Sequence, residues 1–190
     1  RSSTDPGSTA ASAHLHPALV YGDLGDRPPA ADHRTRLEQY RPDHHAIERG
    51  VDIVEIDIQM TQEGEFILMH DWSLRRTTNV EIVFPDGAPS RAEAASARQY
   101  RVSDFTLDDI SKLRLKDPGG GDHPVPTLDS VLERTDGKLL LLLELKNWAV
   151  DKLVSLLKDH DTGNILLWTK SNPWKLRDTA QATGIGVAYI

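Results

Sequence analysis

The 190-residue sequence contains no cysteine, which excludes disulfide frameworks, thiolate zinc sites and cysteine nucleophiles. Basic residues are not in excess either: 22 Lys and Arg stand against 29 Asp and Glu, a formal charge of −7. This balance argues against nucleic-acid binding, which needs a basic patch. Long apolar runs are also missing. The longest spans Leu139 to Leu143, whereas a transmembrane helix needs about 20 apolar residues, so we expect no transmembrane segment.

The sequence starts at Arg1 instead of a methionine, and residues 1–13 consist mostly of Ser, Thr, Ala, Gly, Pro and Asp. Such a segment buries too little apolar surface to offset the entropy lost on ordering, so we predict a disordered tail. Its composition and the missing methionine favour a secreted or periplasmic, processed protein; otherwise we expect a cytoplasmic one. Nothing in the composition indicates an oligomeric state.

From residue 14 to residue 190, short apolar strands alternate with amphipathic helices, which predicts one domain built from parallel βαβ units. The predicted strands are 18–22, 51–58, 66–70, 138–145, 165–168 and 186–190, and the predicted helices are 36–48, 107–115, 127–135, 150–157 and 173–182. Residues 79–106 fit neither pattern and are predicted to be an inserted loop region. The architecture is an open doubly wound sheet or a (β/α) barrel. No glycine-rich phosphate loop follows the first strand, which disfavours a dinucleotide-binding sheet.

Polar side chains occupy one face of the predicted strands, since successive side chains point to opposite faces. Along residues 53–59 the apolar face carries Val54, Ile56 and Ile58, and the opposite face carries Glu55, Asp57 and Gln59. The strand at 138–145 leads into Glu144 and Lys146, and the strand at 66–70 ends in His70. In (β/α) barrels the active site lies at the C-terminal ends of the strands. We therefore predict that these polar side chains meet at that edge of the sheet.

Three carboxylates, Glu55, Asp57 and Glu144, would repel one another at one edge unless a cation or shared protons intervened. An all-oxygen ligand set favours a hard divalent ion over zinc. The sequence therefore predicts a site for Mg²⁺ or Ca²⁺.

An ordered series of short motifs over residues 46–148 resembles the glycerophosphodiester phosphodiesterases, which belong to the phosphatidylinositol-phosphodiesterase-like TIM-barrel superfamily. The motifs are Gly50 to Asp57, Thr61 to Gly64, Met69-His70-Asp71, Arg76-Thr77-Thr78-Asn79, Pro126-Thr127-Leu128 and Glu144-Leu145-Lys146. Each one alone would be weak, but their order and spacing together are specific.

The resemblance implies a (β/α)8 TIM barrel that hydrolyses small-molecule glycerophosphodiesters to glycerol 3-phosphate and an alcohol. It also implies that Glu55, Asp57 and Glu144 hold the divalent cation and that His70 is the catalytic acid or base. Lys146 would bind the substrate phosphate. A carboxylate beside the imidazole, for which Asp71 is the candidate, would fix the tautomer of His70.

The family normally opens with a His-Arg-Gly motif on its first strand, whereas the candidate strand here runs from Leu19 to Asp23. Neither the His33-Arg34 pair nor any other N-terminal histidine fits by spacing. General acid–base catalysis is worth about 10²–10⁴-fold in rate. Two alternatives therefore stay open: a catalytically impaired barrel that binds a phosphate ligand or a protein partner, and a related phospholipase D-like lyase.

Three tryptophans, Trp72, Trp148 and Trp168, follow predicted strand ends. They are candidates for the rim of the substrate pocket, where an indole face can hold a choline cation; packing beneath loops is the alternative role. A complete barrel takes about 250 residues. With six predicted strands, we expect an irregular first unit and a barrel that is incomplete at the C-terminus.

Overall fold

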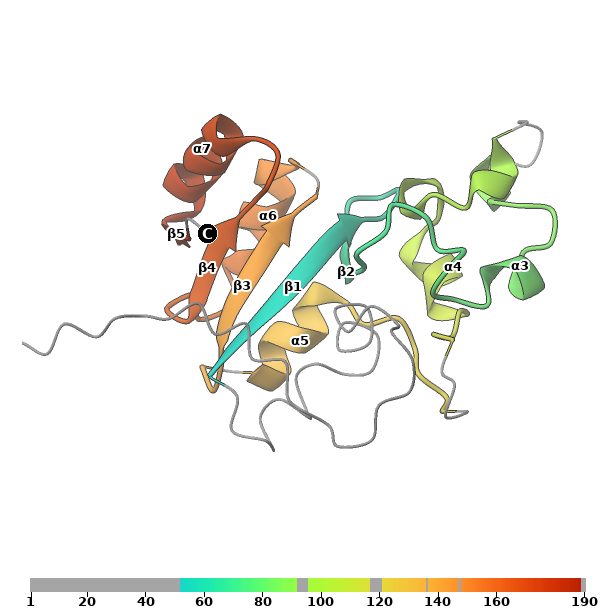
Figure 1. Ribbon diagram of the computed structural model, residues 1–190, viewed down its shortest axis with the longest axis horizontal. Coiled ribbons are helices and arrows are strands. Elements are labelled where there is room, and N and C mark those ends of the chain that lie inside the picture. Colours follow the sequence, from blue (N-terminus) through green and yellow to red (C-terminus); the bar gives the residue numbers. More distant parts are fainter. Residues whose placement is uncertain (1–51, 92–95, 117–120, 136, 147, 189–190) are drawn as a thin grey trace, which may run out of the picture.

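The computed structural model describes residues 52–91, 96–116, 121–135, 137–146 and 148–188. Within these ranges the chain forms an open sheet in the order β2-β1-β3-β4-β5 (Figure 1). The strands are β1 (Ile53–Met60), β2 (Phe66–Leu68), β3 (Leu140–Leu145), β4 (Ile165–Trp168) and β5 (Gly186–Val187). Strands β1, β3, β4 and β5 are parallel and follow one another in chain order. A doubly wound sheet reverses its strand order, so this progression is consistent with part of a barrel, although the sheet is not closed.

The helices are α3 (Val80–Val83), α4 (Leu107–Ser111), α5 (Leu128–Thr135), α6 (Val150–Leu157) and α7 (Pro173–Thr183). Short 3₁₀ helices span Pro89–Arg91, Ala97–Gln99 and Val102–Asp104. The predicted helices at 127–135, 150–157 and 173–182 are confirmed, because apolar spacing and turn residues set their ends. The predicted tail at 1–13, the strand at 18–22 and the helix at 36–48 lie outside the described residues.

One face of the sheet and the helices beside it share the main core. Ile56 and Ile58 of β1 are buried with the alternate leucines of β3. Helices α5, α6 and α7 contribute buried apolar residues to the same cluster: Leu128, Val131, Leu132, Leu153, Leu157 and Leu176. Figure 1 shows α6 and α7 beside β3 and β4. The predicted apolar face of β1 therefore does lie under the helical layer, which leaves the Glu55–Asp57 face for the site.

The predicted direction of the strand at 66–70 is wrong. This strand, β2, pairs antiparallel with β1, with Ile58 opposite Leu68 and Met60 opposite Phe66. Only residues 61–65 connect the two strands, and a parallel crossover needs a dozen residues or more. Gly64, at a φ of +98°, allows the tight reversal. His70 therefore follows a hairpin strand at the edge of the described sheet, not a further barrel strand.

A second apolar core lies beyond β2 and includes the region predicted as an inserted loop. Its fully buried members include Leu74, Val80, Phe105, Ile110 and Leu113. Figure 1 shows this segment, with α3 and α4, extending from the β2 edge of the sheet. In the part of the chain that the structure describes, no helix is long and apolar enough to cross a membrane.

Candidate active site

Asp57, Glu144 and Trp168 lie in one row across three parallel strands. Asp57 of β1 is the register partner of Glu144 of β3, and Glu144 is the register partner of Trp168 of β4. All three residues are buried. The row lies on the face opposite the main core, because each of these residues alternates with a core residue along its strand. Glu144 is near the C-terminal end of its strand, as predicted, but β1 continues to Met60, so Asp57 is inside its strand.

Lys146 connects the two carboxylates of this row. Its Nζ lies 2.7 Å from Asp57 Oδ1 and 2.8 Å from Glu144 Oε1. The acids are almost fully buried, and the lysine side chain is 21% exposed. One ammonium thus neutralises part of the negative charge that two adjacent carboxylates bring into the sheet. We refer to Asp57, Glu144 and Lys146 as the acid–lysine cluster.

Burial and charge act against each other in the acid–lysine cluster. Burial raises the pKa of the Glu144 carboxyl; the hydrogen bond from Lys146 lowers it, and the nearby Asp57 raises it, so that the pKa lies above its usual value. For Lys146, burial by itself lowers the pKa, but the hydrogen bonds to Asp57 and Glu144 outweigh burial and raise it. Lys146 therefore stays charged near neutrality, while Glu144 resists losing its proton.

Glu55 is on the same face but one step earlier in β1. Its register partner is Leu142, not Glu144, and two residues of a strand span about 6.6 Å. The residue is half-buried. The structure therefore brings Asp57 and Glu144 together and places Glu55 in the neighbouring row. The register between β1 and β3 determines which acid of β1 lies beside Glu144, and the sequence pattern does not reveal that register.

His70 forms a second polar group with Asp71 and Arg76. His70 Nδ1 lies 2.9 Å from Asp71 Oδ1, and Arg76 binds the same carboxylate through Nε at 2.5 Å and through a second nitrogen at 2.9 Å. The hydrogen bond from Arg76 lowers the pKa of Asp71, burial opposes this shift, and His70 adds to it. Asp71 therefore accepts a hydrogen bond from the Nδ1–H of His70, the pairing expected from the sequence. Sequence reasoning missed Arg76 as the anchor of Asp71, although the Arg76–Asn79 motif contained it.

The hairpin attaches His70 to the strand that carries Asp57. The backbone N–H of Met69 donates to the backbone oxygen of Asp57 at 3.0 Å. The side chain of Gln59 donates to the backbone oxygen of His70 at 3.3 Å. Gln59 is buried and shares the polar face of β1 with Asp57. The backbone on both sides of His70 is thus fixed to β1.

The described residues do not form a ready divalent-cation site. Within the described ranges, no group of three or more His, Asp or Glu residues is placed to hold a metal ion. Asp57 and Glu144 supply the carboxylate oxygens that hard cations prefer, but both contact the Lys146 ammonium. In this arrangement the positive charge between the two acids belongs to the protein itself.

The three predicted rim tryptophans have different environments, and each has a protein cation over its ring. Trp72 is 59% exposed, and the Arg101 guanidinium lies 5.6 Å from its ring centre. Trp148 is half-buried beneath Lys175, at 6.0 Å. Trp168 is buried beneath Lys170, at 5.1 Å. Sequence reasoning did not foresee these neighbours. Arg101 comes from the segment before the 3₁₀ helix at Val102–Asp104, Lys175 from the first turn of α7, and Lys170 from two residues after Trp168.

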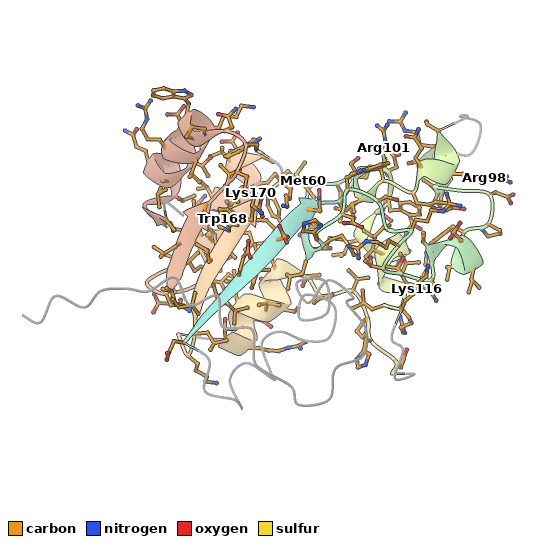
Figure 2. All side chains as sticks on the ribbon, in the orientation of Figure 1. Met60, Arg98, Arg101, Lys116, Trp168 and Lys170 are labelled. Atoms are coloured by element: carbon orange, nitrogen blue, oxygen red, sulfur yellow. The ribbon has the colours of Figure 1, made fainter. Side chains whose placement is uncertain are left out.

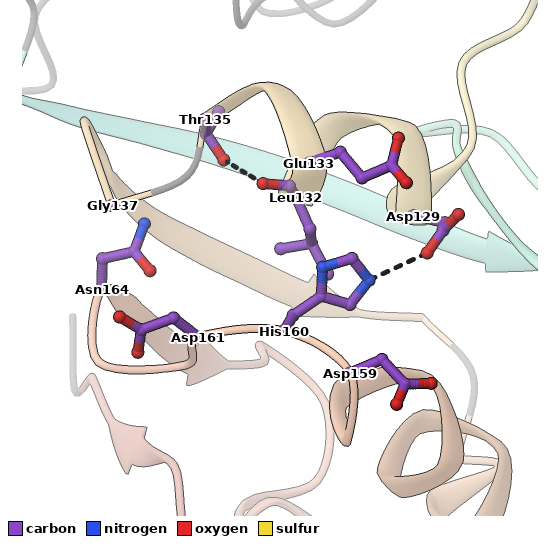
Figure 3. Close-up of a pocket in the computed structure, with 9 residues that line it drawn as sticks. All are labelled: Asp129, Leu132, Glu133, Thr135, Gly137, Asp159, His160, Asp161 and Asn164. Atoms are coloured by element: carbon purple, nitrogen blue, oxygen red, sulfur yellow. Dashed lines mark hydrogen bonds and ion pairs between the residues drawn. The ribbon is translucent and has the colours of Figure 1, made fainter.

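A pocket of about 340 Å³ opens on the side of the sheet where the parallel strands begin, away from their C-terminal ends (Figure 3). Its lining comes from α5 and the turn after it and from the loop before β4, so the pocket lies near the N-terminal ends of β3 and β4. There His160 Nε2 lies 2.8 Å from Asp129 Oδ1. None of the predicted site residues lines this pocket, so it is separate from the acid–lysine cluster.

Known proteins match this chain over most of its length. A bacterial glycerophosphodiester phosphodiesterase from Caldanaerobacter subterraneus subsp. tengcongensis is 29% identical over 158 residues, which is 76% of this chain and 57% of that protein. The mouse glycerophosphodiester phosphodiesterase domain-containing protein 5 is 39% identical over 140 residues, 66% of this chain and 23% of that protein. The chain therefore spans just over half of the bacterial relative and a smaller share of the mouse protein.

Solved structures show the same fold. A phosphodiesterase from Oleispira antarctica, determined in complex with its product sn-glycerol 3-phosphate, is 23% identical, with a TM-score of 0.58 over 77% of this chain and 56% of that one. The glycerophosphodiester phosphodiesterase of Agrobacterium tumefaciens str. C58 is also 23% identical, with a TM-score of 0.56 over 74% of this chain and 54% of that one. The sequence model described as "Glycerophosphoryl diester phosphodiesterase family" matches residues 43–171. This chain belongs to the glycerophosphodiester phosphodiesterase family.

Proposed function

We propose that this chain hydrolyses glycerophosphodiesters and releases sn-glycerol 3-phosphate and an alcohol. The observation that carries the proposal is the acid–lysine cluster beside the His70 hairpin, in a chain of this family. The product bound to the Oleispira antarctica phosphodiesterase supports the choice of product to assay. The substrate is a small molecule, as the sequence predicts.

His70 is proposed to move the protons. In hydrolysis, a water oxygen bonds to phosphorus while the phosphorus–oxygen bond to the alcohol breaks; the water loses a proton and the alcohol oxygen gains one. Ionised Asp71 only accepts hydrogen bonds, so it holds the proton of His70 on Nδ1. Nε2 then carries a lone pair that can take the proton from water and afterwards give it to the alcohol.

Lys146 is proposed to bind the phosphate. An ammonium group has three N–H donors, and two of them are directed to Asp57 and Glu144. The third can reach a phosphoryl oxygen, because the side chain is partly exposed. The two acids fix the position of the ammonium, which would stabilise charge that develops on the phosphoryl oxygens.

Dependence on Mg²⁺ or Ca²⁺ stays a prediction. Asp57 and Glu144, with Glu55 in the neighbouring row, are the residues that would hold the ion. When bound, such an ion would polarise the phosphoryl group. The Lys146 ammonium now occupies the place between the first two acids, so an ion that bound there would compete with it.

The experiment is an enzyme-coupled assay for sn-glycerol 3-phosphate, run on several glycerophosphodiesters with and without Mg²⁺ or Ca²⁺. We expect a phosphomonoester product. No observation in the described residues favours the non-catalytic barrel or the lyase. Phosphorus NMR separates these outcomes, because a lyase forms a cyclic phosphodiester and a non-catalytic barrel forms no product. Either result would contradict the proposal.

A further inference from the structure

Two lysines that follow β4 lie over two indole rings at the edge of the candidate site. Lys170 Nζ is 5.1 Å from the ring centre of Trp168, and Lys175 Nζ is 6.0 Å from that of Trp148. We refer to these four residues as the lysine–indole rim. Figure 2 shows Trp168 and Lys170 together towards the ends of β3 and β4.

The lysine–indole rim adjoins the acid–lysine cluster through Trp168 in the sheet and through Trp148 along the chain. Trp168 is the register partner of Glu144, and Trp148 comes two residues after Lys146. Lys175 lies in the first turn of α7, whose N-cap residue Asn172 accepts a hydrogen bond from its backbone N–H. A substrate whose phosphate reaches Lys146 would therefore extend its alcohol group towards this rim.

The rim offers hydrogen-bond donors and positive charge. Both lysines are exposed, and neither forms an ion pair with any carboxylate among the described residues. In addition, the Trp168 indole N–H is buried and has no hydrogen-bond partner within those residues. An unsatisfied buried donor is costly, and two ammonium groups without carboxylates attract an anion.

We propose that the rim selects glycerophosphodiesters whose alcohol group carries a further anionic group, such as a second phosphate. This proposal rests on the proposed hydrolysis and names the class of substrate. It also replaces the choline expectation, because the indole faces that would hold a choline cation already hold ammonium groups. A cationic alcohol group would meet like charge, whereas a second phosphate would meet two ammonium groups.

The test compares substrates whose alcohol groups differ in charge. Glycerophosphoinositol 4-phosphate and glycerophosphoinositol share an alcohol and differ by one phosphate, and glycerophosphocholine supplies the cation. We expect kcat/KM to fall in that order. In the Lys170→Gln/Lys175→Gln variant, the preference for the phosphorylated inositol over the unphosphorylated one should shrink by up to about fivefold for each lysine removed. Added salt should shrink it in the same way.

The control variant is Lys158→Gln. Lys158 is another exposed lysine, at the C-cap of α6 and therefore towards the opposite edge of the sheet. It should leave the substrate order unchanged. A preference for glycerophosphocholine, or the same substrate ratios in the double variant as in the wild type, overturns the rim proposal while hydrolysis stands.

A binding measurement separates the rim from the catalytic proposal. Titration of each glycerophosphodiester is followed by tryptophan fluorescence, since Trp148 and Trp168 belong to the rim, and by calorimetry. If no substrate is hydrolysed but the phosphorylated inositol binds more tightly than the choline compound, the rim stands and hydrolysis fails. If neither compound binds, the rim proposal fails as well.

Discussion

Asp57 and Glu144 face each other on adjacent parallel strands as register partners, and each contacts the same ammonium group, that of Lys146. Two carboxylates so close and so buried would repel each other strongly if both were ionised. The lysine is therefore a structural part of the site as well as a candidate phosphate ligand. Three of the four predictions below follow from this cluster.

Replacing Lys146 by methionine should destabilise the protein by about 3–5 kcal/mol, since it leaves two buried carboxylates without their cation. Urea unfolding at neutral pH measures the change. Adding Glu144→Gln to the same chain should restore part of the loss, because it removes one of the two charges. Equal stability of Lys146→Met and wild type would show that the contacts of the ammonium contribute nothing.

Stability should depend on pH through Glu144. Its pKa is raised above 4.5 in the folded protein, first of all by burial, so the folded chain keeps a proton that the unfolded chain releases. The contribution of this group is full below pH 4.5 and is lost as pH rises through the folded pKa. As the pH rises from 4.5 through the folded pKa, the wild type should lose stability relative to Glu144→Gln. The exposed Glu133→Gln serves as control and should run parallel to the wild type.

His70→Ala should lower kcat by about 10²–10⁴-fold if the imidazole transfers protons. The chain supplies a matched control in His160. Its Nε2 also lies 2.8 Å from an aspartate oxygen, Oδ1 of Asp129, but His160 is near the N-terminal ends of β3 and β4. His160→Ala should keep its activity within about twofold. Initial rates of sn-glycerol 3-phosphate release measure both variants. Equal losses in the two would rule out a special role for His70.

Binding of divalent cations should improve when Lys146 is removed. The ammonium lies where an ion held by Asp57 and Glu144 would compete for the same oxygens. Calorimetric titration with Ca²⁺ should show Lys146→Met binding at least about tenfold more tightly than the wild type, given the energy of a charge pair at this range. A Lys146→Met/Glu144→Gln variant should lose that gain. Identical affinities in the wild type and Lys146→Met would mean that lysine and metal do not share the acids.

The sequence by itself determined the elements whose signals are local. The apolar spacing from Val150 to Leu157 and the turn after Thr135 define α6 and α5 with little error, since side-chain periodicity within a helix needs no partner. The alternation of Ile56 and Ile58 with Asp57 likewise predicted which face of β1 meets the helices. Motif order predicted the family, which the matches confirm.

Only the tertiary structure decided which polar residues lie in contact with one another. Strand register places Asp57 opposite Glu144 and leaves Glu55 one row away, and a shift of two residues would have exchanged them. The five-residue turn makes β2 antiparallel, so His70 follows a hairpin strand. Lys175 meets the Trp148 indole only because the segments that follow β3 and β4 lie side by side. Each of these contacts joins residues that are distant in the chain or depends on strand pairing, and such pairings are set by the packing of the whole sheet.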